Sequence, residues 1–205
     1  LKRILADQAA KPRGLLGRVA GRLMARVNLE SNEWVVSLLD VQMEDHVLEI
    51  GFGPGTAIRE AAQEAKEGHV AGIDISEAMV ALASSLNQEA IDVGRVDLRL
   101  GEAASLPWEV DRFDKVFAVN VIYLWPRLDP ILKEIRRVLK QGGLVALYLA
   151  PLEIVERLGF REIDLFTIHS SGAVQQAFKE SGFVQVEQES ARIGDGIAVC
   201  VMARK

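Results

Sequence analysis

Residues 47–55, Val-Leu-Glu-Ile-Gly-Phe-Gly-Pro-Gly, restrict the possible folds of this chain more than any other segment. A short apolar run, typical of a buried strand, leads there into three glycines at alternate positions. Residues 56–67 then have the composition of a helix that ends at Gly68. The segment therefore predicts a strand, a glycine turn and a helix. Because a glycine has no Cβ, the turn lets the backbone approach a ligand closely.

The spacing of these glycines separates two kinds of ligand. A dinucleotide fingerprint reads Gly-x-Gly-x-x-Gly and places a pyrophosphate at the helix N-terminus. Here Gly51, Gly53 and Gly55 leave a last gap of one residue, and Glu49 lies just before the turn. A carboxylate there would repel a pyrophosphate but suits a ligand with cationic groups, such as the ammonium and sulfonium of S-adenosylmethionine. The alternative interpretation is that the glycine turn is a tight connection that binds no ligand, and the presence of Glu49 disfavours it.

The rest of the chain alternates between strand and helix patterns, which predicts a single α/β domain with a mostly parallel sheet. The last two expected strands have no helix between them, so they should form an antiparallel hairpin. Residues 151–170 show no clear period. The expected strands are 46–50, 69–74, 96–100, 113–120, 144–150, 183–189 and 197–203. The expected helices are 13–27, one capped by Ser31 or Asn32, 56–67, 77–90 with Ser76 as its cap, 129–139 and 173–181.

Composition excludes several classes of protein. The 205 residues are 49% hydrophobic with a formal net charge of −5, which fits one soluble domain and disfavours a nucleic-acid binder. A single cysteine, Cys200, forms no internal disulfide, so we expect a reducing, cytoplasmic setting. The apolar runs are shorter than the roughly 18 residues that cross a bilayer. No residues have metal-ligand spacing, and we expect no metal.

A second group of residues suits an adenosine. Asp74 ends the expected second strand, where a carboxylate accepts both ribose hydroxyls, although it could also be a charge favoured by a helix dipole. Met79 is suited to lie against an adenine face, with a core methionine as the alternative. Glu102, after the third expected strand, could accept from the adenine amino group or be an exposed loop acid.

Together these segments resemble the class I S-adenosylmethionine-dependent methyltransferases, in the small-molecule branch called methyltransferase type 11. The resemblance covers most of the chain, through residues 49–55, 74, 101–107, 113–120 and 139–144. It implies a Rossmann-like three-layer αβα sandwich with sheet order 3-2-1-4-5-7-6 and strand seven antiparallel. It also implies S-adenosylmethionine as cofactor, S-adenosylhomocysteine as product and a small-molecule acceptor. Where this chain has Glu102 the family usually has Asp. The implied cofactor residues are Glu49, Gly51, Phe52, Gly53, Gly55, Asp74, Ile75, Met79, Glu102, Ala103 and Asn120.

The loop after the fourth expected strand excludes some classes of methyl acceptor. Residues 120–126, Asn-Val-Ile-Tyr-Leu-Trp-Pro, lack the Asp/Asn-Pro-Pro-aromatic motif of amino-methylating DNA enzymes. Cys200, in the last strand, does not suit the cysteine-dependent methylation of cytosine C5 or arsenic. Tyr123 and Trp125 have two interpretations: an aromatic wall that contacts a flat or apolar substrate, or residues of the hydrophobic core. His169 is the candidate general base, with a surface histidine as the alternative, and Tyr123 is the second catalytic candidate.

The N-terminal residues 1–40 form a separate region in this interpretation. The helix 13–27 has an apolar stripe, Leu15, Val19, Leu23 and Val27, and a basic row, Arg18, Arg22 and Arg26. We expect residues 1–40 to be a lid over the site and residues 41–205 to be the methyltransferase domain. A solvated basic face and a contact with an anionic membrane surface are the alternatives.

Two rival functions remain at this point. A non-catalytic S-adenosylmethionine-binding protein would keep the fold without turnover, because a fold alone does not establish a function. A nicotinamide-dependent oxidoreductase would need a Tyr-x-x-x-Lys pair. Four residues after Tyr123 the chain has Arg127, and four residues after Tyr148 it has Leu152, so the pair is absent.

Overall fold

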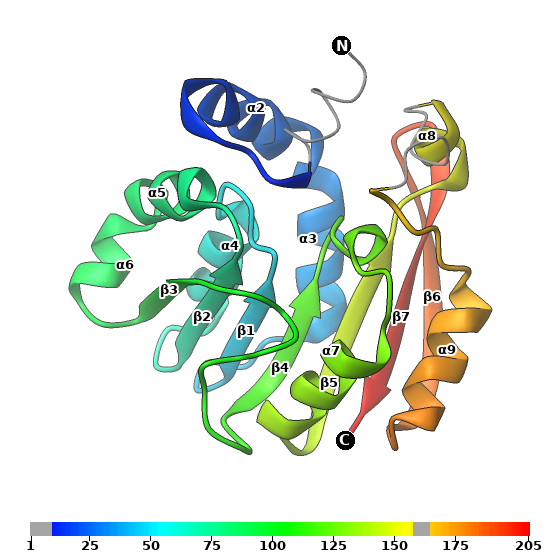
Figure 1. Cartoon of the computed structure of the whole chain (residues 1–205). Helices are drawn as coiled ribbons and strands as arrows, with labels where there is room; N and C mark the ends of the chain where they lie inside the picture. Colours follow the sequence, from blue (N-terminus) through cyan, green and yellow to red (C-terminus); the bar gives the residue numbers. More distant parts are fainter. Residues whose placement is uncertain (1–9, 158–164) are drawn as a thin grey trace.

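The computed structural model describes residues 10–157 and 165–205, which form a seven-stranded sheet between two layers of helices (Figure 1). The order β3-β2-β1-β4-β5-β7-β6 confirms the prediction, as does β7, which pairs antiparallel with both β5 and β6. The strands are β1 (His46–Ile50), β2 (His69–Asp74), β3 (Val96–Leu100), β4 (Phe113–Ala118), β5 (Leu139–Leu149), β6 (Val184–Ile193) and β7 (Gly196–Arg204).

Helices cover both faces of the sheet. One face carries α3 (Leu29–Leu39), α4 (Thr56–Glu64) and α5 (Glu77–Leu86), and the other carries α7 (Asp129–Val138) and α9 (Ser171–Glu180). The remaining described elements are α2 (Gly14–Val27), α6 (Gln88–Asp92), the 3-10 turn η1 (Ile122–Leu124) and α8 (Leu152–Arg157). None of the helices in the described ranges is long and apolar enough to span a bilayer.

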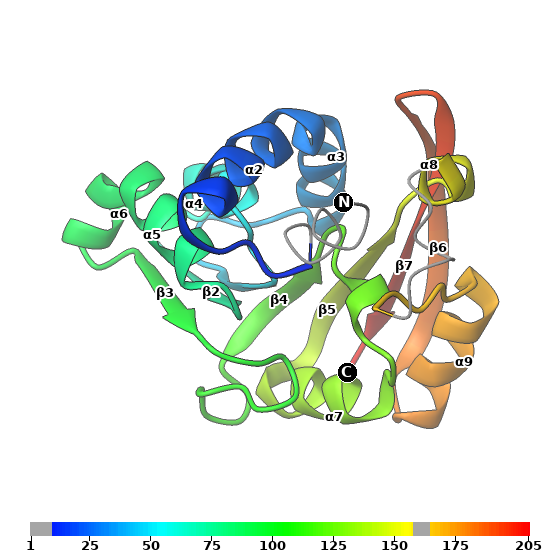
Figure 2. The ribbon, with the colours of Figure 1, turned by 45° about the horizontal axis from the view of Figure 1, so that its top comes forward.

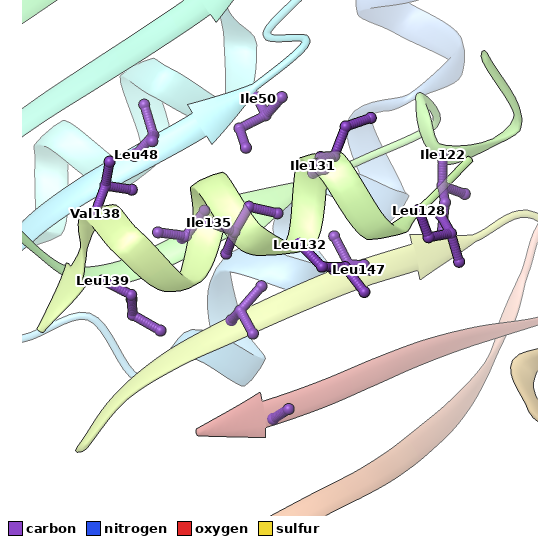
Figure 3. Packing of buried hydrophobic residues seen from close by; sticks show 14 of the residues in the cluster. Leu48, Ile50, Ile122, Leu128, Ile131, Leu132, Ile135, Val138, Leu139 and Leu147 are labelled. Carbon is purple, nitrogen blue, oxygen red and sulfur yellow. The ribbon is translucent and has the colours of Figure 1, made fainter. Parts of the chain in front are cut away.

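The central strands are buried on both faces because helices cover each side. Neighbouring Val47 and Leu48 of β1 are both fully buried, yet they belong to the apolar clusters on opposite faces of the sheet. Figure 3 shows the α7 side, where Leu132 and Ile135 pack between β1 and β5. Burying each such side chain stabilises the fold by about 2 kcal/mol. The packed sheet thereby holds the loops at its carboxyl ends in place.

The helix boundaries differ from the sequence prediction where polar side chains make tertiary contacts. The expected cap at Ser31 or Asn32 is wrong, because α3 begins at Leu29. Ser31 instead donates to the carbonyl oxygen of Asn28 at 3.0 Å. Asn32 donates to Oγ1 of Thr56 at 2.7 Å, which ties α3 to the start of α4.

The expected single helix 77–90 is interrupted at Asn87. Its buried side-chain amide donates to the carbonyl oxygens of Gly55 at 3.1 Å and Ala83 at 2.8 Å. These bonds end α5 at Leu86 and attach it to the glycine turn, so α6 starts separately. Helix α4 is also shorter than expected, ending at Glu64. In the segment 151–170, α8 is helical, and residues 158–164 lie outside the described residues.

Helix α2 lies across the carboxyl edge of the sheet, above the ends of β1 and β2 (Figures 1 and 2). It packs on α5 through small residues. A Cβ at Gly21 would lie 2.6 Å from Cε of Met79 and 2.7 Å from Cδ1 of Leu82. The connections of β1 and β4 leave the sheet in opposite directions at this edge, which is where open α/β sheets bind ligands.

Candidate active site

The glycine turn follows β1 and has three left-handed glycines. Gly51, Gly53 and Gly55 have φ of +74°, +53° and +82°. A Cβ at Gly51 would lie 2.7 Å from Cγ2 of Val121, and one at Gly55 would lie 2.5 Å from Cβ of Ala83. At Gly53 no described atom lies within 4 Å of that position. Packing and conformation therefore require glycine at Gly51 and Gly55, whereas at Gly53 only the left-handed conformation does.

This turn borders a cavity of about 250 Å³ at the carboxyl edge of the sheet. Ten of the eleven residues predicted to hold the cofactor line it, namely Glu49, Gly51, Phe52, Gly53, Asp74, Ile75, Met79, Glu102, Ala103 and Asn120. Gly55 is the exception, because it faces α5. Local sequence patterns also missed several lining residues from distant segments: Ala10, Pro12, Met24, Asn28, Asn32 and Thr56.

Asp74 connects the glycine turn to the following helix. The N–H of Gly53 donates to its Oδ2 at 2.9 Å, and the N–H of Ser76 donates to its Oδ1 at 2.8 Å. Burial raises the pKa of Asp74, although both N–H groups oppose that shift. The predicted cap at Ser76 is confirmed, because its Oγ accepts from the N–H of Met79 at 3.2 Å. Asp74 is therefore held in one orientation.

Glu49 lies at the end of β1 and is only 3% exposed. Its Oε2 is buried and has no hydrogen-bond partner among the residues that the structure describes. Burial raises its pKa well above the usual range, Asp74 and Glu60 raise it further, and a hydrogen bond with the Ile58 backbone opposes them. A cationic ligand group next to this oxygen would stabilise the ionised form and lower the pKa. The buried carboxyl is thus suited to bind a cation.

Asn120 lies two residues past the end of β4, where the backbone turns sharply. Its φ is +56°, an uncommon conformation for a residue other than glycine. The next residue, Val121, packs against Gly51, so the two loops fit closely. The Asn120 amide approaches Oγ of Ser31 at 3.4 Å, which brings α3 to the same place. Residues from β1, β4 and α3 therefore meet at this side of the cavity.

The two catalytic candidates are not among the described residues that line the cavity. Tyr123 accepts at its carbonyl oxygen from the N–H of Thr167 at 2.7 Å, and its ring packs edge-on against Phe166. Burial raises the pKa of its phenol well above the usual range. His169 donates from Nε2 to the carbonyl oxygen of Trp125 at 2.8 Å. Both residues therefore connect the segment 165–170 to the β4–α7 loop, and Trp125 is the aromatic residue of that loop which lines the cavity.

The N-terminal residues reach the cavity through contacts that no local pattern could indicate. Oγ of Ser76 donates to the carbonyl oxygen of Pro12 at 2.5 Å, although the two lie 64 residues apart. Met24 and Asn28 line the cavity from the end of α2. Their positions depend on how α2 packs on α5, so the sequence contained no signal for them.

The charged side chains that line the cavity are all acidic among the residues that the structure describes. The charged side chains among its described lining residues are Glu49, Asp74 and Glu102, and no Arg, Lys or His accompanies them. Within the described ranges, no three His, Cys, Asp or Glu residues are grouped as metal ligands. The lining favours a neutral or cationic ligand.

This sheet order, with acids at the ends of β1 and β2 beside a glycine turn, defines a class I methyltransferase fold. Residues 47–143 match the family model described as a methyltransferase domain. The chain is 31% identical over 190 residues to the "Uncharacterized methyltransferase YdaC" of Bacillus subtilis (strain 168), and the match covers 91% of this chain and 98% of that protein. The chain belongs to the S-adenosylmethionine-dependent methyltransferase family.

Two solved structures share the fold. A SAM-dependent methyltransferase from Aquifex aeolicus superposes with a TM-score of 0.72 at 20% identity, over 91% of this chain and 97% of that one. Haemonchus contortus phosphoethanolamine N-methyltransferase 2, in complex with S-adenosyl-L-methionine, has a TM-score of 0.76 at 18% identity. That match covers this whole chain but only 60% of the nematode enzyme. S-adenosylmethionine is the cofactor of this chain, and the unpartnered buried Oε2 of Glu49 fits a ligand with cationic groups.

Proposed function

We propose that this enzyme transfers the methyl group of S-adenosylmethionine to a neutral, largely apolar small molecule. The absence of any cationic side chain from the described lining of the cavity carries this proposal. The described lining supplies no Arg, Lys or His that could pair with an anionic acceptor, and burying such an acceptor without a partner is unfavourable at low dielectric. A phosphate-bearing acceptor, as in the name of the nematode enzyme, would therefore bind poorly here.

In this proposal, ten lining residues hold the cofactor, and Gly55 supports them by packing against Ala83. Glu49 accepts from the ammonium group, Asp74 accepts from the ribose hydroxyls, and Glu102 accepts from the adenine amino group. Met79 lies against the adenine face. The other cofactor residues are Gly51, Phe52, Gly53, Ile75, Ala103 and Asn120.

The acceptor lies on the opposite wall of the cavity, which is mostly apolar. Leu124, Trp125, Pro126 and Ile131 are among the described lining residues, together with Met24 from α2. Asn28 supplies an uncharged amide there. Such a wall binds a flat or aliphatic molecule by burial of apolar area and orients one polar group by hydrogen bonding.

When bound, the cofactor would supply an electrophilic methyl group on a sulfonium. The acceptor atom would bond to this carbon as the carbon–sulfur bond breaks, with S-adenosylhomocysteine as the leaving group, and a hydroxyl or amine acceptor would release its proton as H⁺. The chain contributes mainly alignment and the exclusion of water. We propose that residues 1–40 form a lid that excludes water from the cavity. Two observations support this proposal: Ser76 donates a hydrogen bond to the carbonyl oxygen of Pro12, and Met24 lines the cavity. We also propose a reducing, cytoplasmic location, supported by the single cysteine of the chain, Cys200, which is a buried free thiol.

Two measurements test this function. Calorimetric titration with S-adenosylhomocysteine should show one site, whereas oxidised nicotinamide dinucleotide should not bind. Methyl transfer is then assayed with pairs of acceptors that share a carbon skeleton, such as an alcohol and its phosphate ester. The neutral member should be methylated faster. Faster methylation of the phosphate ester would contradict the acceptor class. Cofactor binding without transfer to any acceptor would favour the non-catalytic alternative.

A further inference from the structure

Helix α2 turns Gly17 and Gly21 toward the protein and Val19, Leu23 and Val27 outward. Gly17 and Gly21 are buried, and the contact at Gly21 leaves no room for a side chain against Met79. Val19, Leu23 and Val27 are 64%, 63% and 69% exposed. These three residues, spaced four apart, form an outward apolar stripe along the helix. An exposed stripe of this kind indicates a surface that contacts something apolar.

The charge around this stripe differs from the rest of the chain. Residues 11–29 hold five basic residues and no Asp or Glu, although the whole chain has a formal net charge of −5. Arg26, in the last turn of α2, is exposed beside the stripe. A helix that combines an apolar stripe with arginines lies readily in the interface of an anionic bilayer.

A second copy of the chain could also cover this stripe, but less favourably than an anionic lipid surface. In a two-fold dimer the same patch of each copy meets its equivalent, so dimerisation through the stripe would bring two basic segments together. Like charges at such short separation repel each other. Anionic lipid headgroups instead provide the opposite charge. The combination of stripe and charge therefore favours a lipid surface over a second copy of the chain.

We propose that α2 docks this protein on an anionic lipid surface, with the stripe of Val19, Leu23 and Val27 in the interface and the exposed Arg26 on the headgroups. Helix α2 lies over the carboxyl edge of the sheet (Figure 2). The same helix contributes Met24 to the cavity, and Asn28 follows it there. Docking therefore places the cavity next to the lipid. One consequence, that an apolar acceptor enters from the bilayer, rests on the proposed function, whereas the docking itself does not.

Sedimentation of the full chain with vesicles tests the docking. The wild-type protein should sediment with vesicles of phosphatidylcholine containing phosphatidylglycerol, and much less with phosphatidylcholine alone. The double variant Val19→Asp, Leu23→Asp should lower the apparent vesicle affinity by about tenfold or more. Arg26→Gln should make the binding less sensitive to salt.

A matched control separates docking from a general charge effect. Val93 and Val110 are 68% and 61% exposed and precede β3 and β4, at the other end of the sheet. The double variant Val93→Asp, Val110→Asp adds the same two negative charges but should bind vesicles like the wild type after correction for net charge. Both double variants should bind S-adenosylhomocysteine normally, which shows that they fold.

Three results would overturn the docking proposal: a wild-type protein that does not sediment with anionic vesicles, an equal loss in both double variants, or a dimer that only the stripe variant dissociates. The last would show that a second copy covers α2. Cofactor binding and the acceptor assay are done without lipid, so failure of the docking and failure of the proposed function give separate results.

Discussion

The backbone N–H of Gly53 donates to Oδ2 of Asp74 at 2.9 Å, so the glycine turn after β1 and the acid at the end of β2 form one unit. The two motifs lie 21 residues apart and their strands are adjacent in the sheet. Because a charge-assisted bond joins them, a change in either residue should disturb the other.

Replacement of Asp74 should remove cofactor binding without unfolding the protein. Asp74→Ala deletes the proposed acceptor for the ribose hydroxyls and the observed acceptor for the N–H of Gly53, so the affinity for S-adenosylhomocysteine should fall on the order of 100-fold. Calorimetry measures the affinity and circular dichroism checks the fold. Glu77→Ala is the control, because Glu77 is an exposed acid in the first turn of α5. An equal loss in both variants would indicate that Asp74 acts only through the helix dipole.

Gly53→Ala and Gly94→Ala should separate backbone strain from ligand contact. Both glycines have positive φ, +53° and +74°, and neither has a described atom within 4 Å of its Cβ position. Each alanine should therefore cost about 1 kcal/mol of unfolding free energy. Only Gly53 lines the cavity, so only Gly53→Ala should weaken S-adenosylhomocysteine binding. Unchanged affinity in both Gly53→Ala and Asp74→Ala would contradict the assigned cofactor site.

Glu49→Gln should raise stability and lower cofactor affinity together. The pKa of Glu49 is raised in the folded protein, so its contribution to stability is complete below the unfolded pKa near 4.5 and is lost as pH rises through the folded pKa. The variant, which cannot ionise, should be more stable than wild type at pH 8 and equal to it near pH 4. Denaturant unfolding at both pH values measures this difference. Lower stability of the variant at pH 8 would contradict the raised pKa.

Glu60→Gln is the matched control for Glu49→Gln. Burial raises the pKa of Glu60 to about 7, and Glu33 adds to this effect. Its contribution to stability should therefore be lost between about pH 4.5 and pH 7, and the variant should gain stability above that range. Glu60 acts on Glu49 only at a distance and is not among the described lining residues, so Glu60→Gln should change the affinity for S-adenosylhomocysteine much less than Glu49→Gln does. A loss of affinity equal to that of Glu49→Gln would mean that general acidity, and not contact, determines binding.

His169→Gln and His169→Leu should distinguish a general base from a structural donor. His169 donates to the carbonyl oxygen of Trp125, and a glutamine amide can replace that donor whereas a leucine cannot. If the role is structural, His169→Gln should keep most of the methylation rate and His169→Leu should lose it mainly through KM. If His169 is a base, both variants should lose kcat, together with the acidic limb of the pH–rate profile.

The pattern of residues 47–55 and the alternating strands and helices were enough to predict the sheet order through family resemblance, and the structure confirms that order. The Ser76 cap was predicted equally well. These features depend on residues near each other in the chain, because strand burial, glycine turns and helix caps are local. The set of lining acids also came from the sequence, since each lies at the end of a strand or just after it, and these strands end at the same edge of the sheet.

Tertiary packing decided the features that join distant segments. Asn32 bonds Thr56 and is not a cap, and His169 bonds the Trp125 carbonyl and does not line the cavity, because the partner of each arrives from elsewhere in the chain. The sequence determined that α2 has an apolar stripe, but only packing decided that the stripe faces outward. Gly21 lets α2 approach Met79 more closely than any larger residue would, so the glycine side turns inward and Leu23 is left exposed.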